Sequence, residues 1–120
     1  MEEMKLGAVE AKFADLIWQN EPIFSGELVK LCSAELEWKK STTYTVLKKL
    51  CERGIFKNEG GVVTSLISRT DYDAMQSEKF VEEQFEGSLP AFLAAFTARK
   101  TLSEEELCAL RRMIDDYKED

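Results

Sequence analysis

Apolar residues at helical spacing predict three helices in the first half of the chain. Within residues 6–19 an apolar side chain returns every three or four positions, which predicts an amphipathic helix. Asn20-Glu21-Pro22 ends this helix, and a short extended segment at residues 23–24 follows. The apolar stripe of the helix comprises Leu6, Val9, Phe13, Leu16 and Ile17.

Capping residues mark the ends of a second and a third helix. Ser25 is a candidate N-cap for the second helix, which extends to about Glu35. The third helix begins at Ser41 or Thr42 and ends at Gly54, which is placed to adopt the left-handed backbone after a helix. The residues of the second helix that we expect to face inward are Leu28, Val29, Leu31 and Cys32.

After the third helix the spacing changes from helical to extended. Residues 55–59 and 62–67 are short β-prone runs joined by Gly60-Gly61, which is typical of a hairpin. Three helices followed by a hairpin, with a basic third helix, are the order of a winged helix-turn-helix domain. We therefore predict a mainly α fold with a small β-hairpin wing, in which residues 1–68 form this domain. The wing has Lys57 as its one basic residue, so we expect it to touch DNA little.

Residues 69–120 are predicted to be helical again and to form a C-terminal dimerisation region. Thr70–Asp73 resembles a capping box, Ser88 caps a short helix after Gly87, and Ser103–Glu106 is a capping box for the last helix. The short helix is apolar almost all round, so we expect it to be buried on most sides. These helices could instead pack within one chain as a cap, but a single winged helix with a weak wing has little DNA affinity, which favours a dimer. The predicted dimer contacts are Phe85, Leu89, Phe92, Leu93, Phe96, Leu107, Leu110 and Ile114.

The third helix has one packing side and one polar side, and the polar side is the candidate site. Thr43, Leu47, Leu50 and Gly54 cluster on the packing side. The opposite side presents hydroxyls, a tyrosine and lysines, which suit a DNA groove because lysine binds phosphate while Ser and Thr bond phosphates or base edges. The alternative is a charged face that is merely solvated. The predicted contacts are Ser41, Thr42, Tyr44, Thr45, Lys48 and Lys49 in the major groove, and Lys39, Lys40 and Arg53 on phosphates.

The charge distribution supports a local rather than a general affinity for nucleic acid. The chain has a formal net charge of −7, yet residues 39–57 contain six basic residues and one acid, a local charge of +5. A basic patch on an acidic body binds phosphate locally and predicts modest non-specific affinity with steep salt dependence. The acidic balance and the weak wing also leave a second hypothesis open, in which the winged helix is a protein-interaction module with an oligomerisation arm.

The residues that enzymes and metal sites require are scarce. The chain has no histidine and three widely spaced cysteines, Cys32, Cys51 and Cys108, without a CxxC motif. This pattern is neither a zinc site nor a disulfide framework, and we expect three buried thiols. There is no phosphate-binding loop or nucleophile motif, so we predict no enzyme, no cofactor and no metal. No apolar run is long enough to span a membrane and no signal-peptide core is present, so we expect a cytoplasmic protein.

Several short stretches share their order and spacing with a known protein family. They are Glu10 through Trp18; Trp38, Thr42, Thr45, Leu47, Leu50 and Gly54; Ile67-Ser68 and Tyr72; Phe85 and Gly87-Ser88; and Leu102-Ser103, Glu106-Leu107 and Leu110. Along almost its whole length the chain resembles the penicillinase-repressor family, the bacterial winged-helix repressors of β-lactamase and methicillin-resistance genes.

The resemblance implies a homodimeric transcriptional repressor that reads an inverted repeat in operator DNA with its third helix. It also implies inactivation by proteolysis in the dimerisation region when a membrane sensor detects a β-lactam. The Asn-Phe cleavage site of the family aligns with Ala95-Phe96, so a cut at this candidate site needs different recognition. Lys49 stands where the family usually has arginine, which keeps the charge but loses bidentate geometry. The paired cysteines of copper-responsive relatives are absent, so metal sensing is not implied.

Overall fold

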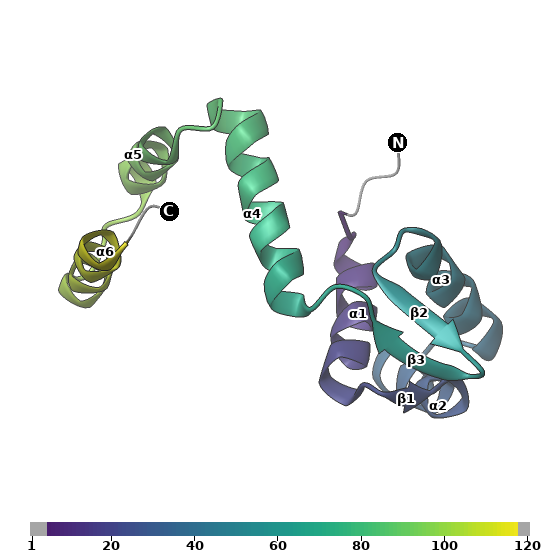
Figure 1. Cartoon of the computed structure of the whole chain (residues 1–120). Coiled ribbons are helices and arrows are strands. Elements are labelled where there is room, and N and C mark those ends of the chain that lie inside the picture. Colours follow the sequence, from purple (N-terminus) through teal and green to yellow (C-terminus); the bar gives the residue numbers. More distant parts are fainter. Residues whose placement is uncertain (1–4, 118–120) are drawn as a thin grey trace. The chain divides into compact units, whose positions relative to one another are not determined.

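The computed structural model describes residues 5–117 of the chain (Figure 1). The described elements, in chain order, are α1 (Ala8–Asn20), β1 (Ile23–Phe24), α2 (Ser25–Leu36), α3 (Lys40–Glu52), β2 (Phe56–Glu59), β3 (Val62–Ser65), α4 (Arg69–Phe85), α5 (Leu89–Arg99) and α6 (Glu104–Asp116). They form a mainly α fold with a small antiparallel sheet, which confirms the predicted winged helix followed by C-terminal helices.

The chain divides into two compact units, Met1–Gln76 and Ser77–Asp120, and the division falls inside α4. The first turns of α4 belong to the N-terminal unit, where Tyr72 is buried with its ring centroid 5.6 Å from that of Trp18. Its hydroxyl oxygen also accepts a hydrogen bond of 2.9 Å from the Leu6 amide. The predicted functional domains, residues 1–68 and 69–120, stay predictions.

The N-terminal unit has a closed hydrophobic core between α1, α2, α3 and the sheet. Its fully buried large side chains come from every one of these layers and include Phe13, Ile17, Leu28, Leu50, Ile55, Phe56 and Val63. The buried face of α1 runs through Phe13, Ala14 and Ile17, whereas Val9 is exposed, so the predicted stripe was wrong at that position. The tryptophans pack as core residues: Trp38 stacks on Phe13, and Trp18 donates from Nε1 to the Ile67 carbonyl at 3.0 Å.

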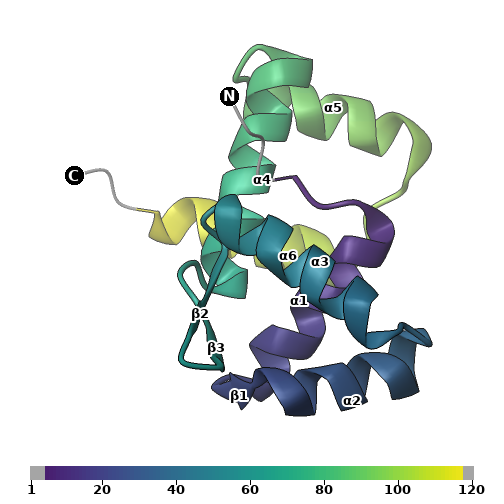
Figure 2. The ribbon, with the colours of Figure 1, turned by 90° about the vertical axis from the view of Figure 1, so that its right-hand side faces the viewer.

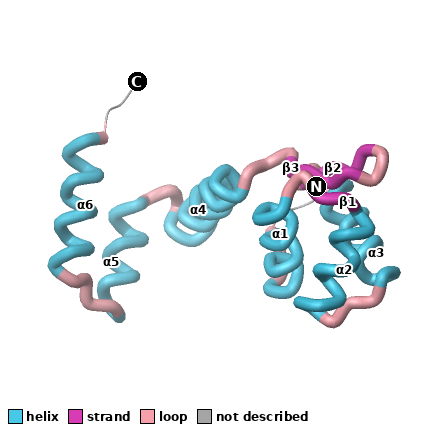
Figure 3. Tube along the Cα trace, turned by 90° about the horizontal axis from the view of Figure 1, so that it is seen from below, coloured by secondary structure: helices cyan, strands magenta, loops and turns pink. Residues whose placement is uncertain are grey.

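The sheet has the strand order β1-β3-β2, with both pairs antiparallel. Gly60 and Gly61 connect β2 to β3 with φ of 61° and 85°, the left-handed pair that a two-residue hairpin turn requires. The hairpin and the short extended segment at Ile23–Phe24 were both predicted and are confirmed. In Figure 3 the three strands lie together at one end of α1, α2 and α3.

Helix ends differ from the prediction by one or two residues. Ser25 is the first residue of α2 and makes no cap bond, and α3 begins at Lys40 rather than at Ser41 or Thr42. The start of α4 is stabilised by Ser68, whose Oγ accepts from the Asp71 amide at 3.0 Å, so the capping pair precedes the predicted one. Short polar side chains near a helix start compete for the same amides, which makes the register of a cap hard to predict.

The end of α3 agrees with the prediction. Gly54 has φ of 82°, and its amide donates a hydrogen bond of 3.0 Å to the Cys51 carbonyl. The Ile55 amide donates a second hydrogen bond, of 3.1 Å, to the Leu50 carbonyl. These two bonds form a Schellman motif, which needs a left-handed residue after the helix and therefore favours glycine. The motif turns the chain from α3 directly into the buried start of the wing.

The C-terminal unit contains the end of α4 with α5 and α6. Ser88 caps α5, and Ser103 with Glu106 forms the predicted capping box of α6. Four phenylalanines from α4 and α5 form a chain of ring contacts with centroids 5.6–6.1 Å apart: Phe80, Phe85, Phe92 and Phe96. No residue of α5 is buried, and Leu89 and Phe96 are 56% and 44% exposed. The prediction that α5 is buried on most sides is therefore wrong for the single chain.

Candidate nucleic-acid interface

The outward face of α3 is polar because its apolar residues are committed to the core. Thr43, Leu47 and Leu50 are buried against the rest of the N-terminal unit, as predicted. The helix lies at the front of this unit in Figure 2. Its exposed residues are Ser41, Thr42, Thr45, Lys48, Lys49 and, as the one acid, Glu52 at its end, together with Lys40 at its first position and Lys39 just before it.

Tyr44 is the half-buried member of the predicted set. Its hydroxyl donates to Ser25 Oγ at 3.0 Å, which ties the start of α3 to the start of α2. Tyr44 and Lys48 also line a cavity of about 340 Å³ with Leu47, Cys51 and Asn58, so the cavity lies between α3 and β2. Only the part of the tyrosine ring away from Ser25 is free to meet a ligand.

The basic residues of the site fall into two groups. Among the described residues, Lys39, Lys40 and Lys48 make no ion pair and remain available to an anion. Lys49 Nζ lies 2.9 Å from Glu10 Oε2, and Arg53 NH1 lies 3.5 Å from Glu10 Oε1. The Arg53 side chain is 15% exposed and also donates to the Lys5 carbonyl at 3.4 Å. A phosphate contact by Arg53 thus requires the guanidinium to leave Glu10.

Glu10 was not predicted to belong to the site. Its carboxylate accepts from Lys49 and from the Gly7 amide at 3.1 Å, and these two hydrogen bonds, followed by the charges of Lys49 and Arg53, hold its pKa below the usual 4.5 despite partial burial. A signal was present in the sequence, because Glu10 precedes Phe13, Ala14 and Ile17 at spacings of three, four and seven. An acid on the buried stripe of a helix needs a basic partner from another element.

The three cysteines differ in how far they are exposed to solvent. Cys32 is buried and Cys51 is half-buried, and burial raises the pKa of both thiols. Cys108 is exposed on α6, so the prediction of three buried thiols was wrong there. A high thiol pKa leaves little thiolate at neutral pH, so neither Cys32 nor Cys51 is an activated nucleophile. Residues 5–117 contain no group of acids and cysteines that could hold a metal ion.

The wing adds little positive charge. Lys57 Nζ lies 3.1 Å from Glu59 Oε1 on the same strand, β2, so the one basic residue of the hairpin is paired with an acid. The exposed Gly60 follows directly at the turn. The polar face of α3 is therefore the stronger candidate surface in the N-terminal unit.

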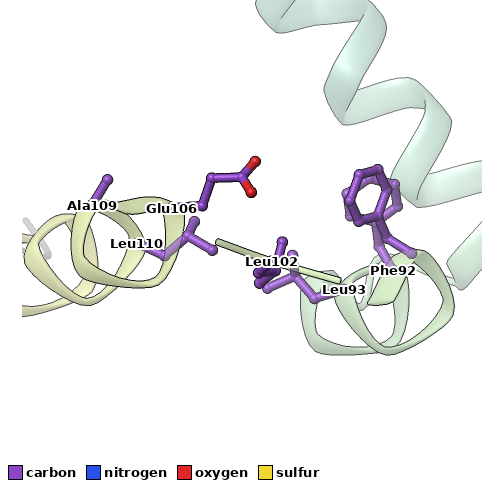
Figure 4. A pocket seen from close by; sticks show the side chains of 7 residues that line it. Phe92, Leu93, Leu102, Glu106, Ala109 and Leu110 are labelled. Atoms are coloured by element: carbon purple, nitrogen blue, oxygen red, sulfur yellow. The ribbon is translucent and has the colours of Figure 1, made fainter. Parts of the chain in front are cut away.

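The C-terminal unit has a groove of about 320 Å³ between α5 and α6 (Figure 4). In this view Leu102 lies between the two helices beside Leu93, and Leu110 lies on the α6 side of the groove. Of the predicted dimer contacts, Phe85, Phe92, Leu93, Leu107 and Leu110 are partly buried, whereas Leu89, Phe96 and Ile114 are exposed. The Ala95–Phe96 bond of the candidate cleavage site lies inside α5, and both residues are exposed.

None of the helices in the described part of the chain is long and apolar enough to cross a membrane.

The order of helices and strands defines a winged helix-turn-helix protein. The chain belongs to the penicillinase repressor family, which matches residues 6–116, and is thus a transcriptional repressor of that family rather than an enzyme. Among curated proteins it is similar to the penicillinase repressor of Bacillus licheniformis, with 26% identity over 118 residues that cover 95% of this chain and 92% of the relative. It is also similar to the methicillin resistance regulatory protein MecI of Staphylococcus aureus (strain N315) and of Mammaliicoccus sciuri. Each is 18% identical over 115 residues, which cover 92% of this chain and 94% of the relative.

Proposed function

We propose that this repressor is a cytoplasmic homodimer that binds an inverted repeat in double-stranded operator DNA with α3 in the major groove. The observation that carries the proposal is the division of α3 into a buried side and an exposed side of hydroxyls and lysines with Glu52 as its one acid. In helix-turn-helix proteins the second helix of the pair enters the major groove and contacts base edges. The family to which the chain belongs supports the same function.

The exposed residues of α3 divide by chemistry into two roles. Ser41, Thr42 and Thr45 offer hydroxyls, and the threonines also offer methyl groups, so they are assigned to base edges together with the free edge of Tyr44. Lys39, Lys40 and Lys48, which are exposed, are assigned to phosphates. Arg53 is assigned a structural role instead, because its pairing with Glu10 connects the end of α3 to α1.

The proposal of a homodimer rests on the apolar surface of the C-terminal unit. Large apolar side chains stay exposed there in the single chain, among them Phe80, Leu89, Met113 and Ile114. A second copy that buries them would present two recognition helices with two-fold symmetry, which matches an inverted repeat. The two half-sites should then lie about 34–36 Å apart or at a multiple of that spacing.

Proteolytic inactivation at Ala95–Phe96 by a membrane sensor is not part of the proposal. Proteases cut most readily at exposed loop tips with an irregular backbone. The Ala95–Phe96 bond lies within a regular helix, α5, and Thr97 Oγ1 donates back to the Leu93 carbonyl at 2.7 Å within the same segment.

A titration of the full-length protein against the DNA upstream of its own gene, at several salt concentrations, tests the proposed function. Tight binding with two chains per site and a steep salt dependence is expected. Lys48→Ala should weaken binding and reduce the slope of log K against log salt by about 0.9, since one phosphate contact is lost. Lys30→Ala, which removes a charge paired with Glu27 on α2, is the matched control.

The second candidate function is a winged-helix module that binds another protein and no specific DNA. The net charge of −7 and the pairing of Lys57 with Glu59 at the wing favour it. The same titration separates the two candidates, because an interaction module would bind its upstream DNA no more tightly than an unrelated duplex. A folded protein that binds neither duplex at low salt would overturn the first candidate and favour the second.

A further inference from the structure

Two adjacent lysines of α3 are in different electrostatic environments. Lys48 is exposed and makes no ion pair with any described residue. Lys49 is exposed as well, with 53% of its side chain accessible, yet its Nζ lies 2.9 Å from Glu10 Oε2 of α1. Of these two neighbours, Lys48 therefore presents an unneutralised ammonium group, whereas Lys49 shares its charge with a carboxylate.

The carboxylate of Glu10 is held in place from several sides. Its Oε1 accepts from the Gly7 amide at 3.1 Å, and Arg53 NH1 approaches the same oxygen at 3.5 Å. The side chain is 20% exposed and lies on the stripe of α1 that faces the core. A carboxylate fixed in this way stays beside Lys49 when an anion approaches from solvent. The lowered pKa of Glu10 keeps it ionised at neutral pH.

We propose that Glu10 competes with DNA phosphate for Lys49 and thereby lowers the affinity of the α3 face for DNA of any sequence. A lysine meets phosphate as a point charge, so a fixed carboxylate 2.9 Å from its ammonium group opposes that contact directly. Non-specific binding depends on these charges alone, whereas specific binding also has base contacts. Glu10 thus restrains the non-specific part of binding. This inference rests on the proposed DNA-binding function.

The test compares the full-length wild-type protein with Glu10→Gln on a duplex of random sequence at pH 7 and three salt concentrations. Glutamine keeps the shape and can still accept from the Gly7 amide, but it does not neutralise Lys49. The variant is expected to bind about twofold to fivefold more tightly at low salt, the change that loss of one partly exposed ion pair corresponds to. Its slope of log K against log salt should steepen by up to about 0.9.

Four further variants separate competition from a general charge effect. Asp15→Asn makes the same charge change on the same helix, but its partner is Arg69 at 2.8 Å, so its salt slope should equal that of the wild type. In a Lys49→Met background the effect of Glu10→Gln should vanish, whereas in a Lys48→Met background it should persist. Glu10→Asp keeps the charge on a shorter side chain and should give an intermediate gain.

The binding data can overturn either the proposed competition or the proposed DNA-binding function, and the two cases are distinguishable. A folded Glu10→Gln protein that binds no more tightly than the wild type overturns the competition and leaves the proposed repressor function intact. A gain that persists without Lys49 also overturns it, because the effect would then come from release of Arg53 or from long-range repulsion of DNA. If Glu10→Gln does not fold, Glu10→Asp takes its place. An affinity of Glu10→Asp equal to that of the wild type then overturns the competition. Failure of the wild-type protein to bind any duplex at low salt overturns the proposed function itself.

Discussion

The two units of the molecule differ in how completely a single chain buries their apolar side chains. In the N-terminal unit α1, α2, α3 and the sheet enclose fully buried residues such as Phe13 and Phe56. Between residues 77 and 117 no residue is buried, although the segment is rich in Phe and Leu. One unit therefore has a core of its own, and the other has apolar faces that only a further surface can cover. Stability in the first should be independent of concentration, and in the second it should depend on association.

The largest expected effect is the loss of a core aromatic in the N-terminal unit. Phe56 is fully buried and its ring centroid lies 5.4 Å from that of Trp18. Phe56→Ala removes buried surface and leaves a cavity, so it should lower the free energy of unfolding by about 3–5 kcal/mol. Denaturant unfolding followed by tryptophan fluorescence measures this, since both tryptophans lie in this unit. We expect Phe56→Ala to lower the free energy of unfolding equally at every protein concentration. A decrease that becomes smaller on dilution would contradict a core that lies within one chain.

The next effect concerns association through the C-terminal unit. Ile114 is 69% exposed in the single chain, so Ile114→Ala should leave monomer stability almost unchanged. Truncation of an apolar side chain that a second copy covers should weaken the dimer about tenfold, or about 1.4 kcal/mol. Sedimentation equilibrium over a range of concentrations gives the dissociation constant. Val9→Ala, an exposed apolar residue of the N-terminal unit, is the matched control and should leave the constant unchanged.

A smaller effect is the pH dependence of stability that Glu10 confers on the N-terminal unit. Its pKa in the folded protein lies below the usual 4.5, so its stabilising contribution is present above pH 4.5 and is lost as the pH falls through the folded-state pKa. The wild type should therefore be more stable than Glu10→Gln at pH 7, and the difference should shrink towards pH 3. Thermal unfolding at both pH values measures it. Glu27→Gln, which breaks an exposed pair with Lys30, should change the melting temperature little at either pH.

The core and the polar side of α3 were predictable because both follow from periodicity. The 100° spacing places Thr43, Leu47 and Leu50 together, and the structure buries all three. The wing was equally predictable, since Gly60-Gly61 between two β-prone runs permits few turns. Patterns that arise within one element are readable without knowledge of the neighbouring elements.

What the sequence did not reveal depends on contacts between elements. The partner of Lys49 is Glu10, nearly forty positions away, and no local spacing connects the two. Likewise, the burial expected for α5 from its composition is not met inside one chain, because composition shows that a helix needs cover but not what covers it. The exposed Cys108 belongs to the same group, since Met113 and Ile114 on α6 are exposed as well.

The smallest expected effect comes from glycine substitutions at one strained backbone position in each unit. Glu37 follows α2 with φ of 56°, and Glu86 follows α4 with φ of 51°, a conformation in which a residue with a Cβ is disfavoured. Glycine at either position relieves the strain, so Glu37→Gly should stabilise the N-terminal unit by about 0.5–1 kcal/mol. If the C-terminal unit gains its stability by association, Glu86→Gly should instead raise the melting temperature of the dimer in a concentration-dependent transition. Calorimetry at two protein concentrations distinguishes the two transitions, with Lys30→Gly in the interior of α2 as a control that should destabilise.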